Sequence, residues 1–279
     1  MYTLNCNGKL IDLSTPKIMG IINVTPDSFY DGGKTVTTEE IISRASKMLS
    51  EGATFLDVGG YSSRPGATEI SETEELKRVI PVIASLTTEF PEAIISVDTF
   101  RSIVAKEAIL AGAAIVNDIS GGGMDPEMFS TIAQLQIPYI LMHMRGTPQT
   151  MSAQTNYDNV TREVLLFFSE RIAIAQKAGI NDIIADPGFG FSKTQEQNFQ
   201  LLNELELFGQ LEIPILIGIS RKSMICKTLK VTPNEALNGT TALHAIAILK
   251  GASILRVHDV KEAVECITLI ENLKVLPNF

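Results

Sequence analysis

The stretch "IISVDTFRSIVAKEAILAGAAIVNDI", residues 94–119, contains two short apolar runs on either side of a segment with helical character. The runs "IISVDT" and "AIVNDI" are almost continuously hydrophobic until each reaches an acidic residue. Such a run is typical of a strand that is buried on both faces, as in a parallel sheet covered by helices. The segment between them predicts a helix that ends at Gly112. The stretch therefore predicts a strand–helix–strand unit.

The same unit recurs along the whole chain. Several helical segments follow residues suited to capping: threonine precedes the acids of "TTEEIISRASKMLSEG", Ser71 and Glu74 have capping-box spacing, and Asp125 before Pro126 predicts another helix start. The expected strands are residues 17–22, 54–58, 94–99, 114–119, 138–144, 182–186, 214–219 and 253–259.

Eight strand–helix pairs in 279 residues favour a closed (β/α)₈ TIM barrel. No stretch reads as a linker or a strong repeat, so residues 1–279 are expected to form a single domain. The alternative is a doubly wound open sheet. That fold would normally show an edge strand or an early glycine-rich dinucleotide turn, and neither stands out.

Composition limits the classes of function. The net charge of -9 argues against a broad nucleic-acid or membrane surface, but it leaves room for a small anionic ligand. No apolar run approaches the ~20 residues that span a bilayer, and the N-terminus lacks the pattern of a signal peptide. Three widely spaced cysteines predict neither a disulfide framework nor a zinc ribbon. A cytoplasmic location is expected.

Polar residues stand where almost every expected strand ends. In barrels of this kind the chemistry gathers at the C-terminal ends of the strands. Each residue alone is a common cap or turn residue, but together they predict a polar ring at the barrel mouth. The residues are Asn23, Asp57, Asp98, Asn117, Asp118, His143, Asp186, Ser220, Arg221, Lys222, Arg256 and His258.

The acidic and basic members of this ring suggest a ligand in two parts. Buried carboxylates are costly unless they meet donors, so several of them together predict a heterocycle rich in N–H groups. Basic residues from different strands predict a phosphate or diphosphate; they are Arg64, Lys222, Arg256 and His258. Arg256 and His258 are two residues apart and should share one strand face.

Several blocks in this order resemble the dihydropteroate synthase family: "GIINVTPDSFYDGG", "DVGGYSSRPGA", "SVDTF", "VNDISGG", "DPGFGF", "GISRKS" and "RVHD". The resemblance covers roughly residues 18–259. It implies a TIM barrel, usually a homodimer, that condenses (7,8-dihydropterin-6-yl)methyl diphosphate with 4-aminobenzoate and releases diphosphate, with Mg²⁺ involved. A dissociative, SN1-like route is expected, because the pterin can delocalise the positive charge.

The resemblance also implies a role for each matching residue. The pterin pocket should contain Asp57, Asp98, Asn117, Asp186 and Lys222. The diphosphate site should contain Asn23, Ser63, Arg64, Arg256 and His258, with Asn23 near the metal. The aminobenzoate pocket should contain Phe29, Pro65, Phe191 and Ser223. The catalytic set is expected to be Asn23, Asp31, Arg64, Lys222, Arg256 and His258.

The stretch "NVTPDSFYDGG", residues 23–33, is long for a strand-to-helix connection and is expected to act as a lid. The two mobile family loops correspond to residues 24–34 and 61–68. Phe29 should cover the aminobenzoate side, and Asp31 could reach Arg64 or Mg²⁺.

Three positions depart from the common family pattern. Tyr61 stands where glutamate is frequent, Ser63 where threonine is frequent, and Arg145 where glutamine is frequent. The serine keeps the hydroxyl group, whereas the tyrosine removes any acidic role. His143 is expected to be structural.

Two other readings remain open. A pterin-dependent methyltransferase domain would share the barrel and the pterin-binding carboxylates but should lack a diphosphate site. A pterin-binding paralogue without turnover would not need the basic residues.

Overall fold

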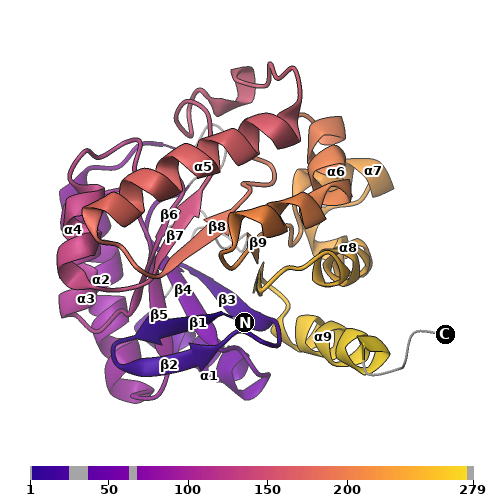
Figure 1. Cartoon of the computed structure of the whole chain (residues 1–279). Helices are drawn as coiled ribbons and strands as arrows, with labels where there is room; N and C mark the ends of the chain where they lie inside the picture. The colour runs from indigo at the N-terminus through magenta and orange to yellow at the C-terminus, as the bar shows by residue number, and fades with distance from the viewer. Residues whose placement is uncertain (1, 25–36, 63–67, 275–279) are drawn as a thin grey trace.

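The computed structural model describes residues 2–24, 37–62 and 68–274, and its centre is a parallel sheet of eight strands (Figure 1). The strands are β3 (Lys17–Asn23), β4 (Phe55–Gly59), β5 (Ile94–Asp98), β6 (Ile115–Asp118), β7 (Tyr139–Met142), β8 (Ile183–Asp186), β9 (Leu216–Ile217) and β10 (Ile254–Val257). Their order in the sheet is β8-β7-β6-β5-β4-β3-β10-β9. Each predicted strand is present.

A parallel bridge between Ala185 and Ile215 brings the two ends of this sheet together. Beside it, the amide of Ala185 donates a hydrogen bond of 2.9 Å to the carbonyl oxygen of Pro214. The first and last strands of the sheet thus meet, which gives a nearly closed barrel. The TIM-barrel prediction is confirmed, and the open-sheet alternative is wrong.

Helices surround the barrel (Figure 1). They are α1 (Thr38–Ser50), α2 (Glu72–Glu89), α3 (Ser102–Leu110), α4 (Met128–Leu135), α5 (Val160–Ala178), α6 (Gln195–Asn203), α7 (Ser223–Leu229), α8 (Leu237–Leu249) and α9 (Val260–Lys274), with short 3₁₀ turns η2 (Met151–Ala153), η3 (Leu205–Leu211) and η4 (Pro233–Glu235). The sequence patterns did not predict α7, which lies between β9 and α8. Within the described ranges, no helix has the length and apolar character to cross a membrane.

Two of the three predicted helix starts are confirmed. Thr37 and Glu40 form a reciprocal capping box at the start of α1, and the Ser71 hydroxyl accepts from the amide of Glu74 at 3.2 Å. At the third, α4 begins at Met128, two residues after the predicted first position Pro126. Asp125 still accepts at Oδ1 from the amide of Glu127 at 2.9 Å, directly before α4. Its Oδ2 accepts from the amide of Ser102 at 2.7 Å, so Asp125 also caps the neighbouring helix α3.

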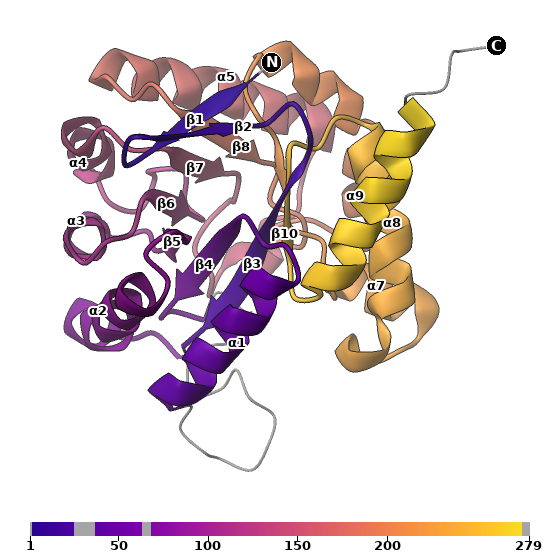
Figure 2. The same ribbon diagram turned by 90° about the horizontal axis from the view of Figure 1, so that it is seen from below.

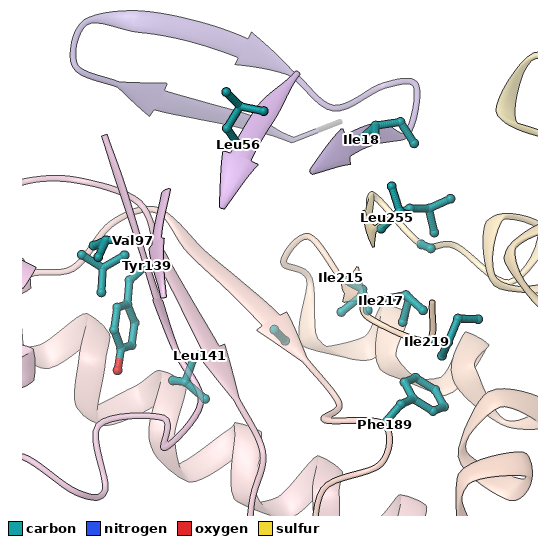
Figure 3. Close-up of a cluster of buried hydrophobic side chains, with 14 of the residues drawn as sticks. Ile18, Leu56, Val97, Tyr139, Leu141, Phe189, Ile215, Ile217, Ile219 and Leu255 are labelled. Carbon is teal, nitrogen blue, oxygen red and sulfur yellow. The ribbon is translucent and has the colours of Figure 1, made fainter. Parts of the chain in front are cut away.

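The outward faces of the strands pack against the helices. Figure 3 shows side chains of this layer, among them Leu56, Tyr139, Leu141 and Leu255, which belong to one continuous cluster of buried apolar residues. Tyr139 meets Phe129 of α4 edge-on, with ring centroids 5.8 Å apart. Because both faces of each strand are buried, the strands needed the near-continuous apolar runs seen in the sequence.

A second apolar cluster fills the end of the barrel where the strands begin. It combines the first inward-facing residue of several strands with residues of an N-terminal hairpin, β1 (Thr3–Cys6) and β2 (Lys9–Asp12). Figure 2 shows this hairpin lying across that end of the barrel. The hairpin was not predicted from the sequence. It closes the end opposite the polar ring, so the barrel mouth is left as the open end.

We expect Leu4→Ala to lower the free energy of unfolding by about 2–5 kcal/mol, since Leu4 is 1% exposed within this plug. Denaturant titration measures the loss. Leu10→Ala in the same hairpin is the matched control, because Leu10 is 72% exposed and its removal should cost less than about 0.5 kcal/mol. Equal losses for the two variants would contradict the plug.

Candidate active site

The polar ring is built by the alternation of side chains along the strands. Residues two apart on a strand face the same way, so a polar residue two positions after an inward apolar residue also points into the barrel. Each of four strands places a polar side chain above the apolar plug in this way: Phe55 is followed by Asp57, Ile115 by Asn117, Ile184 by Asp186, and Ile254 by Arg256.

Arg256 holds the first part of the ring together. Its Nε donates to Asp57 Oδ2 at 2.5 Å, and its Nη2 donates to Asp98 Oδ2 at 2.7 Å. Asn117 Nδ2 donates to the same oxygen of Asp57 at 3.0 Å. Side chains of β4, β5, β6 and β10 are thus joined directly. Arg256, a basic residue predicted to bind phosphate, therefore lies among the carboxylates predicted to bind the heterocycle.

The electrostatics of this group follow from burial. Burial raises the pKa of Asp98 to about 7; Arg256 opposes the shift and Asp57 adds to it. Burial also acts to lower the pKa of Arg256, but Asp57 and Asp98 outweigh it and hold that pKa above its ordinary value. Asp57 Oδ1 is buried and has no hydrogen-bond partner among the described residues. It is therefore an acceptor that a ligand N–H could satisfy.

Asp186 and Lys222 form the second part of the ring. Lys222 Nζ donates to the carbonyl oxygen of Phe189 and lies 4.6 Å from the ring centroid of Phe191. Burial lowers the pKa of Lys222 to about 8 against the opposing field of Asp186. Burial raises the pKa of Asp186, which Lys222 opposes. Both groups border Gly218, where an added Cβ would lie 3.9 Å from Asp186 Oδ2 and from Lys222 Nζ.

His258 lies directly after β10 and contacts Ser220 in the segment that follows β9. Its Nδ1 is 3.0 Å from the hydroxyl of Ser220, and that hydroxyl accepts from the His258 amide at 3.2 Å. Burial, aided by Arg256, lowers the pKa of His258 to about 3, so the ring is neutral at physiological pH. Arg221 forms a bidentate ion pair with Asp259: Nε donates to Oδ2 at 2.9 Å and Nη2 donates to Oδ1 at 2.5 Å.

The remaining predicted residues fall into two sets. Asn23 is the last residue of β3, paired with Gly59; Phe191 lies beside Lys222; and Ser223 is exposed at the first position of α7. The others lie outside the described residues: Phe29, Asp31, Ser63, Arg64 and Pro65, together with most of both predicted loops, 24–34 and 61–68.

Asp118 and His143 are strand-end residues with structural partners. Asp118 accepts from the amides of Ser120 and Gly122 and from the Tyr139 hydroxyl at 2.6 Å. His143 lies with its ring edge-on to Phe167, at 4.8 Å between centroids. Because alternation points Asp118 away from its neighbour Asn117, only Asn117 joins the ring.

Two of the residues that depart from the common family pattern, Tyr61 and Arg145, lie within the described part of the chain, and both make local contacts. Tyr61 is buried, meets Phe100 edge-on at 5.1 Å, and accepts from Gln149 Nε2 at 2.8 Å. It thereby fastens the segment after β4 to the segment after β7. The Arg145 guanidinium stacks 3.7 Å over Tyr157 and pairs with Glu163 at 2.6 Å, which anchors it to the start of α5.

Sequence reasoning missed Lys193, a buried lysine whose Nζ lies 2.9 Å from His143 Nδ1. It also missed the backbone acceptor at Phe189. A lysine that closes the glycine- and phenylalanine-rich stretch "PGFGFSK" directly after a strand was the available signal. Backbone acceptors leave no such signal, because every residue type carries the same carbonyl group.

Metal ligands are sparse in the described part of the mouth. Across residues 2–24, 37–62 and 68–274, no group of three or more histidine, cysteine or acidic side chains could hold a metal ion. Mg²⁺, however, usually binds through one or two protein oxygens together with substrate phosphates and water. The amide oxygen of Asn23 at the end of β3 is a donor of that kind. The residues therefore fit an Mg²⁺ ion held mainly by a substrate.

Fold and site together define a TIM-barrel protein with a ring of polar side chains at the C-terminal ends of its strands. The family described as pterin binding enzyme matches residues 19–258, and the chain belongs to that family. Dihydropteroate synthase of Escherichia coli K12 is 46% identical over 270 residues, which cover 96% of this chain and 95% of that protein. The Bacillus subtilis dihydropteroate synthase is 44% identical over 88% of this chain and 84% of its own length.

Solved structures agree with these relatives. A Yersinia pestis dihydropteroate synthase in complex with a sulfonamide drug has a TM-score of 0.94 at 42% identity, covering 99% of this chain and 100% of that one. A Xanthomonas albilineans dihydropteroate synthase with 4-aminobenzoic acid has a TM-score of 0.92 at 41% identity, covering 99% of each chain. Within the pterin-binding enzymes, the relatives are thus dihydropteroate synthases.

Asp98 should give the protein a measurable pH dependence of stability. The native carboxyl keeps its proton up to about pH 7, whereas in the unfolded chain it loses the proton near pH ~4. The native state then binds more protons between these values, so the contribution of Asp98 to stability falls as the pH rises. We expect Asp98→Asn to remove this decline, which amounts to at most about 4 kcal/mol.

The measurement is the difference in unfolding free energy between wild type and Asp98→Asn from pH 4.5 to 7.5. The difference is needed because burial lowers the pKa of His143, His244 and His258, and these groups change the stability in the opposite direction. Glu92→Gln, at an exposed position, is the control. A constant difference across this range would mean that Asp98 is ionised in the native state throughout.

Proposed function

We propose that this chain condenses (7,8-dihydropterin-6-yl)methyl diphosphate with 4-aminobenzoate to give 7,8-dihydropteroate and diphosphate, a step of folate synthesis. The observation that carries the proposal is that Asp186 and Lys222, which interact electrostatically and both border Gly218, accompany the group formed by Arg256, Asp57 and Asp98. Related dihydropteroate synthases have been solved with 4-aminobenzoic acid and with 7,8-dihydropteroate, which supports both halves of the reaction.

Recognition of the pterin follows from hydrogen-bond complementarity. The pyrimidine edge of a pterin offers neighbouring N–H donors, and one carboxylate can accept two of them, a role that suits Asp186. Asp57 Oδ1 is a further acceptor, without a partner among residues 2–24, 37–62 and 68–274, and Asn117 can donate as well as accept. Lys222 supplies a donor for a ring oxygen or nitrogen. A buried polar pocket of this kind discriminates strongly, because a wrong ligand would leave its groups unpaired.

Departure of diphosphate is the step that needs charge stabilisation. Breaking the methylene–oxygen bond leaves negative charge on the diphosphate, and Arg256 with His258 lies at the adjacent strand ends. In the free protein Arg256 is engaged by Asp57 and Asp98. Binding of pterin N–H groups to these carboxylates would free guanidinium donors for the diphosphate. The positive charge left on the methylene spreads into the pterin, which favours an SN1-like route.

The second substrate needs little activation. An arylamine is neutral at pH 7 and can attack without a strong base, so catalysis is mainly positioning. Phe191 and Ser223 are proposed for the aminobenzoate pocket, together with Phe29 and Pro65. Asp31, Ser63 and Arg64 are proposed for the diphosphate side of the mouth. A lid formed by residues 24–34 is part of the same proposal.

Diphosphate release that depends on 4-aminobenzoate, with 7,8-dihydropteroate identified by mass, tests the function. A pterin-dependent methyltransferase would instead transfer a methyl group to a corrinoid. A pterin-binding paralogue would bind pterin without turnover.

Homodimer formation, a single domain and a cytoplasmic location remain predictions. Sedimentation can test the dimer, and the exposed apolar side chains of α8 and α9 are the first place to look for its interface: Ile246, Leu249, Leu269 and Leu273.

Lys222→Ala should lower kcat/KM for the pterin diphosphate at least tenfold, because a charge-assisted hydrogen bond contributes about 1.5–3 kcal/mol. Steady-state kinetics at saturating 4-aminobenzoate measure the loss. Lys227→Ala, at an exposed position of the same helix, is the matched control and should leave the kinetics unchanged. A folded Lys222→Ala protein with full activity would remove Lys222 from the site.

We propose that Mg²⁺ enters with the diphosphate and that Asn23 contributes the protein oxygen. The ion would offset the charge of the departing diphosphate. Treatment with EDTA should abolish turnover and added Mg²⁺ should restore it, while calorimetric binding of free pterin should be unaffected. Asn23→Ala should raise the Mg²⁺ concentration needed for half-maximal rate. Turnover that persists in EDTA would contradict a role for the ion.

A further inference from the structure

The segment between β8 and α6, residues 187–194, carries both groups that hold Lys222. The carbonyl oxygen of Phe189 accepts from Lys222 Nζ, and the ring of Phe191 lies 4.6 Å from it. The same segment also orients Asp186, whose Oδ1 accepts from the amide of Gly188 at 2.8 Å. The relative placement of the carboxylate and the ammonium therefore depends on the shape of this one segment.

Lys193 binds the backbone of the segment 187–194 and so holds its conformation. Its Nζ donates to the carbonyl oxygens of Gly188 at 3.0 Å and Phe191 at 3.1 Å, and lies 2.9 Å from His143 Nδ1. Nζ therefore has three polar partners: two carbonyl oxygens that accept its hydrogens and the ring nitrogen of His143, whose role depends on the tautomer. Burial lowers the pKa of Lys193 well below its ordinary value, and Asp186 opposes this shift. Lys193 is 8% exposed, and no carboxylate of the described residues forms an ion pair with it.

The two carbonyl groups bound by Lys193 stand on either side of Phe189. Fixing both sides restricts the direction of the Phe189 carbonyl between them, and this carbonyl is the acceptor for Lys222. The backbone of the segment is also closely packed at Gly188. This residue has φ +72°, and a Cβ there would lie 2.1 Å from the carbonyl oxygen of His143. Breaking the contacts of Lys193 should therefore release Phe189 and Phe191 together.

We propose that Lys193 is a positioning residue for the reaction: it holds the segment 187–194 so that Phe189 and Phe191 keep the Lys222 ammonium beside Asp186. The expected effect on kinetics rests on the proposed function. The position of the Lys222 side chain, however, can be tested without any substrate. Lys193 makes no hydrogen bond to Lys222 or Asp186 in the described structure, so its hydrogen bonds act through the segment. Its buried amine also interacts electrostatically with both groups.

Lys193→Met tests this assignment because it keeps most of the buried stem and removes all three polar contacts of Nζ. The full chain should stay folded, and kcat/KM for the pterin diphosphate should fall at least tenfold. Lys250→Met is the matched control. Lys250 also donates to a backbone carbonyl, that of Asn203 at 2.7 Å, but it lies at the C-terminal end of α8, away from the barrel mouth. Its removal should leave kcat/KM within twofold.

A double-mutant cycle separates positioning from general loosening of the fold. If Lys193 acts through Lys222, Lys193→Met should cost less than threefold in a Lys222→Ala background. Losses that multiply in the double variant would overturn the proposal. If Lys193→Met does not fold, Lys193→Gln, which retains an amide donor, takes its place in the same cycle. A folded Lys193 variant with unchanged kcat/KM would also overturn it.

An NMR measurement on the Lys222 side chain tests the same proposal without turnover. The ring of Phe191 should shift the ¹³Cε–¹Hε resonance of Lys222 through its ring current, and the signal is assigned by its loss in Lys222→Ala. Lys193→Met should move this resonance toward the position of an exposed lysine, whereas Lys250→Met should not. An unmoved resonance would overturn the proposal. Absence of turnover in the wild type would refute the proposed function, while this measurement would still decide the role of Lys193.

Discussion

The alternation of side chains along parallel strands in a closed barrel is the constraint on which the rest of this structure depends. Each strand must place alternate residues outward against helices and inward against seven other strands. The inward positions form layers, with an apolar plug beneath a polar ring. Closure at Ala185 and Ile215 brings Asp186 of β8 near the residues that follow β9, among them Lys222. The polar pocket is a consequence of this geometry.

Burial of so many polar groups has to be balanced within the ring itself. A carboxylate or ammonium group loses its hydration when it enters the barrel, and its neighbours must replace the lost interactions. Arg256 does this for Asp57 and Asp98, and Lys222 does it for Asp186. The balance is incomplete, since Asp98 keeps a raised pKa and one oxygen of Asp57 has no hydrogen-bond partner in the described part of the chain. A ligand that supplies donors would complete it.

The support beneath the ring comes from segments that look ordinary in the sequence. Three contacts join neighbouring strand-to-helix connections: Lys193 with His143, Tyr61 with Gln149, and the amide of Arg145 with the hydroxyl of Ser192. The connections after β4, β7 and β8 are thereby linked to one another and to the strand ends. Residues that touch no ligand can in this way set the geometry of those that do.

The sequence by itself determined the barrel and most of the polar ring, because hydrophobic runs, helix caps and strand-end residues are local patterns. Asp57, Asn117, Asp186 and Arg256 could be found in this way. Only the tertiary structure decided that Arg256 lies between two carboxylates, that Asp125 also caps the neighbouring helix α3, and that a hairpin plugs the far end of the barrel. The hydrogen bonds involved join residues that are 23 to 199 positions apart in the sequence. A local sequence pattern contains no information about such distant contacts.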